Sequence, residues 1–301
     1  MNSRLDRQRL ISIAKQCWMV LMAVGLAYYL WHNGVHTLST LRAIPATHLF
    51  AALLCILLGK LSALYLMRGS LRLVKSRLST WRESIWVYAS SDIAKYVPGG
   101  VWAIVGRVVH YRNYGMSTVD VSKALLLEHL GLGMTAVVVS LPSALIILAG
   151  QRTAGFTTVA VLAVMAVLLG VMGAWKVVWR RSAWKTSRSD NIRTTLVSST
   201  VMIIGWVSMG TSFSLLLPDI GTFAQWFWSV GSYAAAFIAG MVAVFAPAGA
   251  GVREGVLVLA GQFSGTPTTT MLDAAILNRA LWVIADLLFF LGAFTVRMLA
   301  R

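Results

Sequence analysis

The chain has 301 residues, of which 58% are hydrophobic and only 12% are charged, and its mean hydropathy is +0.74. An average soluble domain carries roughly a quarter charged residues, so this composition excludes a disordered chain, a fibrous repeat and an ordinary soluble enzyme. The net charge of +16 comes from basic residues between apolar runs, where they set membrane topology and contact anionic lipids, so it does not indicate nucleic-acid binding.

Six apolar stretches are long enough to cross a membrane as helices, which takes about 20 residues. In chain order they are 16–32, 47–67, 121–149, 155–179, 195–217 and 271–296. Two further apolar stretches, 85–110 and 224–263, are interrupted by proline and glycine. The sequence therefore predicts an all-α polytopic membrane protein with a single integral membrane domain over 1–301. Its two cysteines lie inside apolar stretches and provide no metal cluster, so we expect no cofactor.

The placement of lysine and arginine decides how the interrupted stretches are drawn. The N-terminus, the 68–82 loop and the 176–193 loop are all basic, and short basic loops stay in the cytoplasm. All of them fall inside if 85–110 and 224–263 each enter and leave the membrane on the same face, as re-entrant hairpins. A pair of complete crossings in place of either hairpin leaves the following loops on the same side of the membrane. Both arrangements leave the N- and C-termini in the cytoplasm.

The two interrupted stretches resemble each other when their prolines are aligned. The breaks consist of Pro98, Gly99 and Gly100 in the first stretch and of Pro247, Gly249 and Gly251 in the second. Three complete spans separate the stretches, so the two hairpins should open to opposite faces, as in an inverted repeat with halves at about 47–149 and 195–296. Paired interrupted helices in two halves point to the binding site of a transporter.

A broken helix at membrane depth has chemical consequences. Proline removes a backbone donor and stops the helix, and glycine allows the sharp turn that follows. The helix that begins after the break presents free N–H groups and the positive end of its dipole, which suits an anion. The alternative is a kink that only allows close helix packing.

Ionisable side chains at membrane depth are costly and usually face a cavity or a partner. Those that we expect to bind substrate are Lys95, Arg107, Glu128, Arg253, Glu254 and Arg279. Arg253 directly follows the second break and could hold a phosphate by a bidentate contact. Glu128 could neutralise Arg253, or accept a proton and couple transport to a gradient. The alternative for these two residues is a buried structural pair.

Other charges have simpler interpretations. Lys95 lies three residues from Asp92, so a local ion pair is an alternative to substrate binding. Arg107 could merely extend its side chain to the membrane interface. Asp120 and Asp273 each follow a hydroxyl residue by three positions, which is the spacing of a capping box at the start of a helix.

At the two breaks the chain resembles a known family. Segment 95–102 reads Lys-Tyr-Val-Pro-Gly-Gly-Val-Trp, and segment 247–255 reads Pro-Ala-Gly-Ala-Gly-Val-Arg-Glu-Gly. Both resemble signatures of the lysylphosphatidylglycerol synthase transmembrane family, whose members include a flippase of aminoacylated phospholipid and stand-alone proteins of cell-envelope lipids. The residues that match are Lys95, Pro98, Gly99, Gly100, Arg107, Pro247, Gly249, Gly251, Arg253 and Glu254.

The resemblance implies a lipid flippase of the bacterial inner membrane, moving a lipid-linked sugar or a modified phospholipid with an anionic phosphate. It also implies a homodimer. The family's aminoacylating members carry a soluble synthase domain after the membrane part, which this chain does not have, so we expect no enzymatic activity. At 248 and 250 the chain has alanine, where the family more often has glycine and leucine, and this departure bears on the shape of the turn.

Two alternatives of other classes follow from the same sequence. One is a membrane enzyme that transfers sugar or acyl groups on lipid carriers. Such enzymes usually hold catalytic acids on a sizeable outer loop, whereas Asp219 is the only acidic residue in the predicted outer loops. The other is a scaffold that does not transport and instead stabilises a lipid-modifying enzyme. The scaffold alternative predicts that changing Arg253 leaves the phenotype intact.

Overall fold

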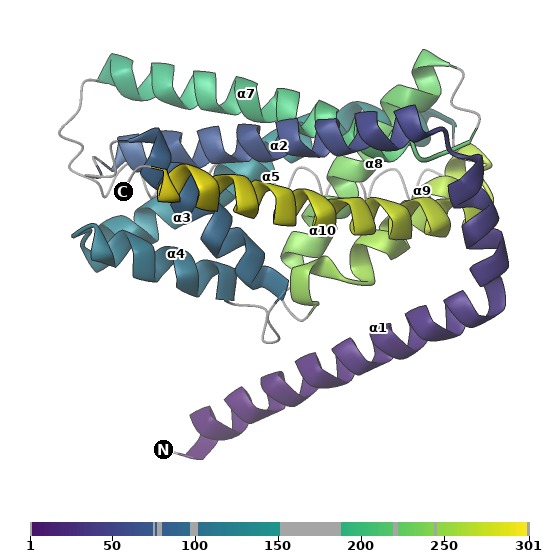
Figure 1. Ribbon diagram of the computed structural model, residues 1–301, viewed down its shortest axis with the longest axis horizontal. Coiled ribbons are helices and arrows are strands. Elements are labelled where there is room, and N and C mark those ends of the chain that lie inside the picture. The colour runs from purple at the N-terminus through teal and green to yellow at the C-terminus, as the bar shows by residue number, and fades with distance from the viewer. Residues whose placement is uncertain are drawn as a thin grey trace.

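The computed structural model describes residues 2–74, 76, 80–96, 102–150, 188–218, 222–243 and 246–299. Within these ranges every regular element is a helix. In chain order the elements are α1 (Asn2–Ala43), α2 (Ala46–Leu73), α3 (Trp81–Ile93), η1 (Ala94–Tyr96), α4 (Trp102–Asn113), α5 (Thr118–Gly150), α7 (Arg188–Ser214), α8 (Phe223–Val242), η2 (Pro247–Gly249), α9 (Val252–Ser264) and α10 (Thr268–Met298). Helices α2, α5, α7 and α10 run lengthwise through the body, and α1 projects away from them (Figure 1).

Four of the described helices are long and apolar enough to cross a membrane. They are Ala46–Leu73, Thr118–Leu141, Asp190–Ser214 and Thr268–Met298. Their outer faces expose large apolar side chains, as at Leu54 and Leu58 of α2 and Leu287 and Leu291 of α10, which suits a lipid environment. The prediction of an all-α fold is therefore confirmed for the described residues, and the four apolar helices are consistent with a membrane protein.

The six predicted spans can be compared one by one with the described helices. The stretches 47–67, 121–149, 195–217 and 271–296 coincide with the four long apolar helices. The stretch 16–32 lies within α1, which is not one of the four, and 155–179 lies outside the described residues. Four of the six predicted spans thus correspond to described helices that are long and apolar enough to cross a membrane.

Each interrupted stretch forms two helices that pack against each other. Helix α3 contacts α4, and α8 contacts α9. The two short 3₁₀ segments, η1 and η2, contact each other, so the two breaks meet inside the molecule. Two segments about 150 residues apart in sequence therefore form one region of the structure.

The helix contacts repeat between the two halves of the chain. Helices α2, α3, α4 and α5 correspond in order to α7, α8, α9 and α10. Helix α5 of the first half packs on α8 of the second, and α10 of the second half packs on α3 of the first. Likewise α4 contacts α5 and α9 contacts α10, while α2 packs on its own counterpart α7. Exchanging the halves leaves this pattern of contacts unchanged, which is what an internal repeat requires.

The second break is formed by backbone in the left-handed region. Helix α8 ends at Val242, and φ is +51° at Ala248, +68° at Gly249 and +82° at Gly251. Only glycine adopts such angles at little cost, so Ala248 is strained. Pro98, Gly99 and Gly100 of the first break lie outside the described residues.

One of the two predicted caps is present as an N-cap hydrogen bond. Ser117 Oγ accepts a hydrogen bond from the backbone N–H of Asp120 at 3.1 Å, which confirms the prediction at the start of α5. The prediction for Asp273 is wrong, because α10 begins at Thr268 and places Asp273 inside the helix. Its buried carboxylate instead accepts hydrogen bonds from Tyr29 at 2.8 Å and Thr37 at 2.6 Å, and so attaches α1 to α10.

Gly249 and Gly255 offer a matched pair for testing the break. A Cβ at position 249 would lie 2.8 Å from the Cα of Gly240 and 3.0 Å from Cδ of Arg253, and φ there is positive. We expect Gly249→Ala to lower the free energy of unfolding by roughly 1–3 kcal/mol, which would appear as a lower midpoint of thermal unfolding in detergent. Gly255 lies inside α9 with open space around it, so Gly255→Ala should stabilise by about 1 kcal/mol. Equal effects of both changes would contradict the structure of the turn.

Candidate functional site

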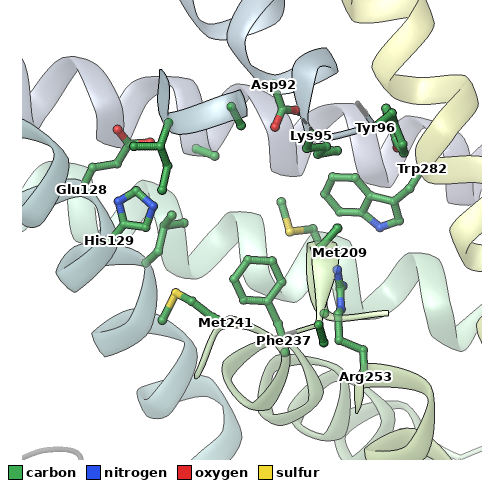
Figure 2. A pocket seen from close by; sticks show the side chains of 18 of the residues that line it. Asp92, Lys95, Tyr96, Glu128, His129, Met209, Phe237, Met241, Arg253 and Trp282 are labelled. Atoms are coloured by element: carbon green, nitrogen blue, oxygen red, sulfur yellow. Dashed lines mark hydrogen bonds and ion pairs between the residues drawn. The ribbon is translucent and has the colours of Figure 1, made fainter. Parts of the chain in front are cut away.

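A cavity of about 460 Å³ lies where the two breaks meet. Every described element except α1 contributes to its wall, with the second break supplying Ala246, Ala248 and Gly249. Most of the wall is apolar, and Phe237 and Met241 project into it from α8 (Figure 2). The cavity thus combines a mostly apolar wall with a minority of polar and charged groups, which is the usual character of a small-ligand site.

Five of the six residues predicted to bind substrate line this cavity: Lys95, Arg107, Glu128, Arg253 and Arg279. Figure 2 shows Glu128 on one side of the cavity, with Lys95 and Arg253 on the other. Glu254 does not line the cavity and lies behind its wall, against Arg279. Among the described lining residues four are basic and two, Asp92 and Glu128, are acidic, so the wall carries an excess of positive charge.

Glu128 pairs with Arg107. Arg107 Nη1 donates to Glu128 Oε1, joining α4 to α5, and both side chains are buried. Arg107 also lies over the ring of Tyr88, with 4.9 Å from its guanidinium carbon to the ring centroid. The predicted pair between Glu128 and Arg253 is therefore wrong, as is the interpretation of Arg107 as a side chain that extends to the interface.

The second half contains an equivalent pair with the charges in reverse order. Arg279 of α10 donates to Glu254 of α9 at 2.6 Å. Glu254 also accepts the backbone N–H of Gly251 at 2.7 Å, and Arg279 donates to the carbonyl of Ala248 at 3.1 Å. These bonds hold the turn in place. They also mean that Glu254 already caps the start of α9, so the helix N-terminus predicted to receive an anion is in part satisfied by the protein.

Arg253 differs from the other lining cations. Its Nη2 donates to the hydroxyl of Tyr233 at 3.0 Å, and its guanidinium lies over the rings of Tyr233 and Phe237, at 5.5 Å and 4.9 Å from their centroids. Tyr233 is held in turn by Trp282, whose indole N–H donates to the same hydroxyl at 2.8 Å. No carboxylate of the described residues lies within 4.0 Å of Arg253. Arg253 therefore forms no ion pair with any acid that the structure describes.

Lys95 belongs to a closed ring of four charges that sequence reasoning did not assemble. Lys60 bonds both Asp92 and Asp286, and Lys95 Nζ lies 3.3 Å from Asp92 Oδ2 and 2.8 Å from Asp286 Oδ2. Tyr96 donates a hydrogen bond to Asp286 as well. The predicted local pair of Asp92 and Lys95 is confirmed, but as one side of a larger ring.

The sequence carried only a partial signal for this ring. Lys60 lies near the midpoint of α2 and Asp286 lies inside α10, and ionisable residues in the middle of apolar spans are rare. They are 226 positions apart, so no spacing rule joins them. Opposite charge at membrane depth was the one available indication that they pair.

The comparisons with known proteins leave the family open. No protein-family model matches this sequence, and no curated protein matches it. Within the described part of the chain, no three histidine, cysteine or acidic side chains gather as a metal site. The chemistry of the cavity therefore has to be argued from its own charges.

The Arg107–Glu128 pair can be tested by a double-mutant cycle. Arg107→Met should leave the Glu128 carboxylate buried without a partner and destabilise by roughly 3–5 kcal/mol. Glu128→Met should act similarly on Arg107. The double variant Arg107→Met/Glu128→Met removes both charges, so it should be markedly more stable than either single variant. Thermal unfolding in detergent measures all three, and additive losses would contradict the buried pair.

Proposed function

We propose that the protein is a lipid transporter that moves an anionic, phosphate-bearing lipid between the leaflets of its membrane. The observation that carries the proposal is the guanidinium of Arg253, which forms no ion pair with a described carboxylate and lies in the wall of a largely apolar cavity. Arg253 is partly buried, and a cation in that position without an acidic partner is costly, a cost that a bound anion would lower. Arginine suits phosphate because its planar fork can donate two parallel hydrogen bonds.

The surroundings of Arg253 favour a lipid over a free anion. Tyr233 and Phe237 hold the guanidinium from α8, and its stem passes against Gly240, where a Cβ would lie 2.5 Å from Arg253 Cγ. The site is thus built to hold one guanidinium in a fixed position. A cavity of about 460 Å³ has room for a polar head group, and the apolar outer faces of the long helices suit acyl or polyprenyl chains that remain in the bilayer.

The repeated helix contacts support transport over catalysis. Many transporters are built from two structural repeats and bind substrate where broken helices of the two halves meet. Here η1 and η2 contact each other beside the cavity, and exchanging the halves preserves the helix contacts. In our proposal the two hairpins are re-entrant, face opposite leaflets and expose the site to each side in turn.

The resemblance at the two breaks supports the same class. It adds to the proposal a place in the lysylphosphatidylglycerol synthase transmembrane family, a bacterial inner membrane with cytoplasmic termini, and a substrate that is a polyprenyl-phosphate sugar or a modified phospholipid. In this scheme Arg253 holds the phosphate. The pairs Arg107–Glu128 and Arg279–Glu254 keep the cavity wall in shape without adding net charge.

The test is transport of a labelled phosphodiester lipid in proteoliposomes. Losing the charge-assisted bonds of Arg253 should weaken substrate binding by on the order of 10- to 100-fold, so Arg253→Met should lose transport at low substrate. Arg112→Gln is the matched control, because Arg112 lies in the same fold but donates to Thr118 at 3.1 Å and does not line the cavity. We expect this control to transport like the unaltered protein.

The outcomes separate the three function classes. Unaltered transport by Arg253→Met would contradict our proposal. If the purified protein turned over a labelled lipid donor, a transferase would replace it. If no variant or unaltered protein moved lipid, while changes on the cytoplasmic loops abolished the phenotype, a scaffold would replace it. Mass spectrometry of lipid co-purified with unaltered protein and with Arg253→Met should show one phosphate-bearing lipid enriched only in the former.

A further inference from the structure

The ring of Lys60, Asp92, Lys95 and Asp286 has a closed side and an open side. The side chains of Lys60 and Asp286 are each 1% exposed, and neither lines the cavity. Those of Lys95 and Asp92 are 23% and 19% exposed, and both line it. A ligand in the cavity can therefore reach one ammonium and one carboxylate of the ring, while the other two charges stay fixed behind them.

The ring is electrically neutral only while Lys95 remains in it. Two carboxylates are then matched by two ammonium groups, in alternating order. Lys95 extends from η1, the segment next to the first break. Its long side chain carries the one ammonium of this ring that lines the cavity. If Lys95 turns toward a bound anion, Asp92 and Asp286 are left to share the single ammonium of Lys60.

We propose that the ring is a proton-binding site linked to anion binding in the cavity, an inference that rests on the proposed function. A phosphate held by Arg253 draws Lys95 out of the ring, and Asp92 then takes up one proton from water. Two carboxylates held against one ammonium in a low-dielectric site cannot both stay ionised at small cost. The step forms one O–H bond on an Asp92 carboxylate oxygen, consumes one proton, and oxidises or reduces nothing.

Asp92 is the acceptor because of its access and its partners. It lines the cavity, from which a proton can arrive, whereas Asp286 is buried and keeps hydrogen bonds from Lys60 and Tyr96 after Lys95 leaves. Once protonated, Asp92 can still accept from Lys60. The ring then returns to neutrality with Lys95 engaged elsewhere.

The neighbouring charged groups do not supply the missing cation. The titratable and charged groups that face the ring are Lys60 from α2, Tyr88 from α3, Lys95 and Tyr96 from η1, Arg107 from α4, Glu128 from α5 and Asp286 from α10. Arg107 is the one further cation among them, and its charge is taken by Glu128. The aromatic rings of Tyr88, Trp282 and Phe289 lie 5.3–5.7 Å from Lys60 Nζ and keep it in place.

The sign of the linkage follows directly. If binding takes up a proton, affinity must rise as pH falls, by up to about tenfold per pH unit for one proton. A counter-ion role without proton uptake would give an affinity independent of pH around neutrality. The two cases can be separated on the purified protein.

The experiment is isothermal titration calorimetry of the full chain in detergent with dihexanoyl phosphatidylglycerol, a phosphodiester that does not itself titrate near neutral pH. Repeating the titration at one pH in buffers of different ionisation enthalpy gives both the affinity and the number of protons taken up. We expect about one proton per bound ligand for the unaltered protein. Binding with no proton uptake would overturn the inference and leave the proposed function standing, whereas absence of binding would overturn both.

Variants of the ring sharpen the test. Asp92→Asn imitates the protonated state, so it should bind the lipid at least as tightly as the unaltered protein but take up no proton. Asp286→Asn removes the other carboxylate and gives a second route to the same result should Asp92→Asn fold poorly. Asp120→Asn changes only the exposed cap of α5 and should leave proton uptake unaltered. Full proton uptake by either ring variant would overturn the assignment.

Discussion

Charge compensation at membrane depth is the constraint on which the interior of this protein depends. Ionisable groups on apolar helices are tolerated when each one finds an opposite charge. Around the cavity this is achieved by the Arg107–Glu128 pair, the Arg279–Glu254 pair and the ring of four. These interactions also determine the fold locally, because each joins a half-helix or a break to a long helix. Arg253 stands outside this balance, and for that reason it is the centre of the proposed site.

The breaks allow the charges to meet. Each interrupted stretch ends its first helix at the cavity, so its polar residues lie there. A continuous helix would instead place some of them beyond the cavity. At the second break the chain turns through left-handed backbone. Because Gly240 and Gly249 have no Cβ, the aliphatic part of the Arg253 side chain fits beside both of them. The site therefore depends as much on the absence of side chains as on their presence.

Sequence reasoning predicted the elements better than their partners. Hydropathy placed four long helices, and proline and glycine marked the interruptions, because both signals are local. It also selected Lys95, Arg107, Glu128, Arg253 and Arg279, all of which line the cavity. Its suggested partners were wrong: Arg253 was one possibility for Glu128, which bonds Arg107, and a cap was expected at Asp273, which binds α1. Partner choice depends on which helices lie side by side, and periodicity carries no information on that.

The repeated contacts between the halves also bear on conformational energetics. A second conformation, in which each half took the present shape of the other, would retain the same set of helix contacts. The two conformations would then differ in free energy mainly through what is not repeated: the ring, which takes three residues from the first half and Asp286 from the second, and Arg253, which has no acidic partner among the described residues. A ligand that contacts both the ring and Arg253 shifts the populations if its binding free energy differs between the two conformations by about that amount. When the conformations are close in free energy, a modest difference in affinity is enough.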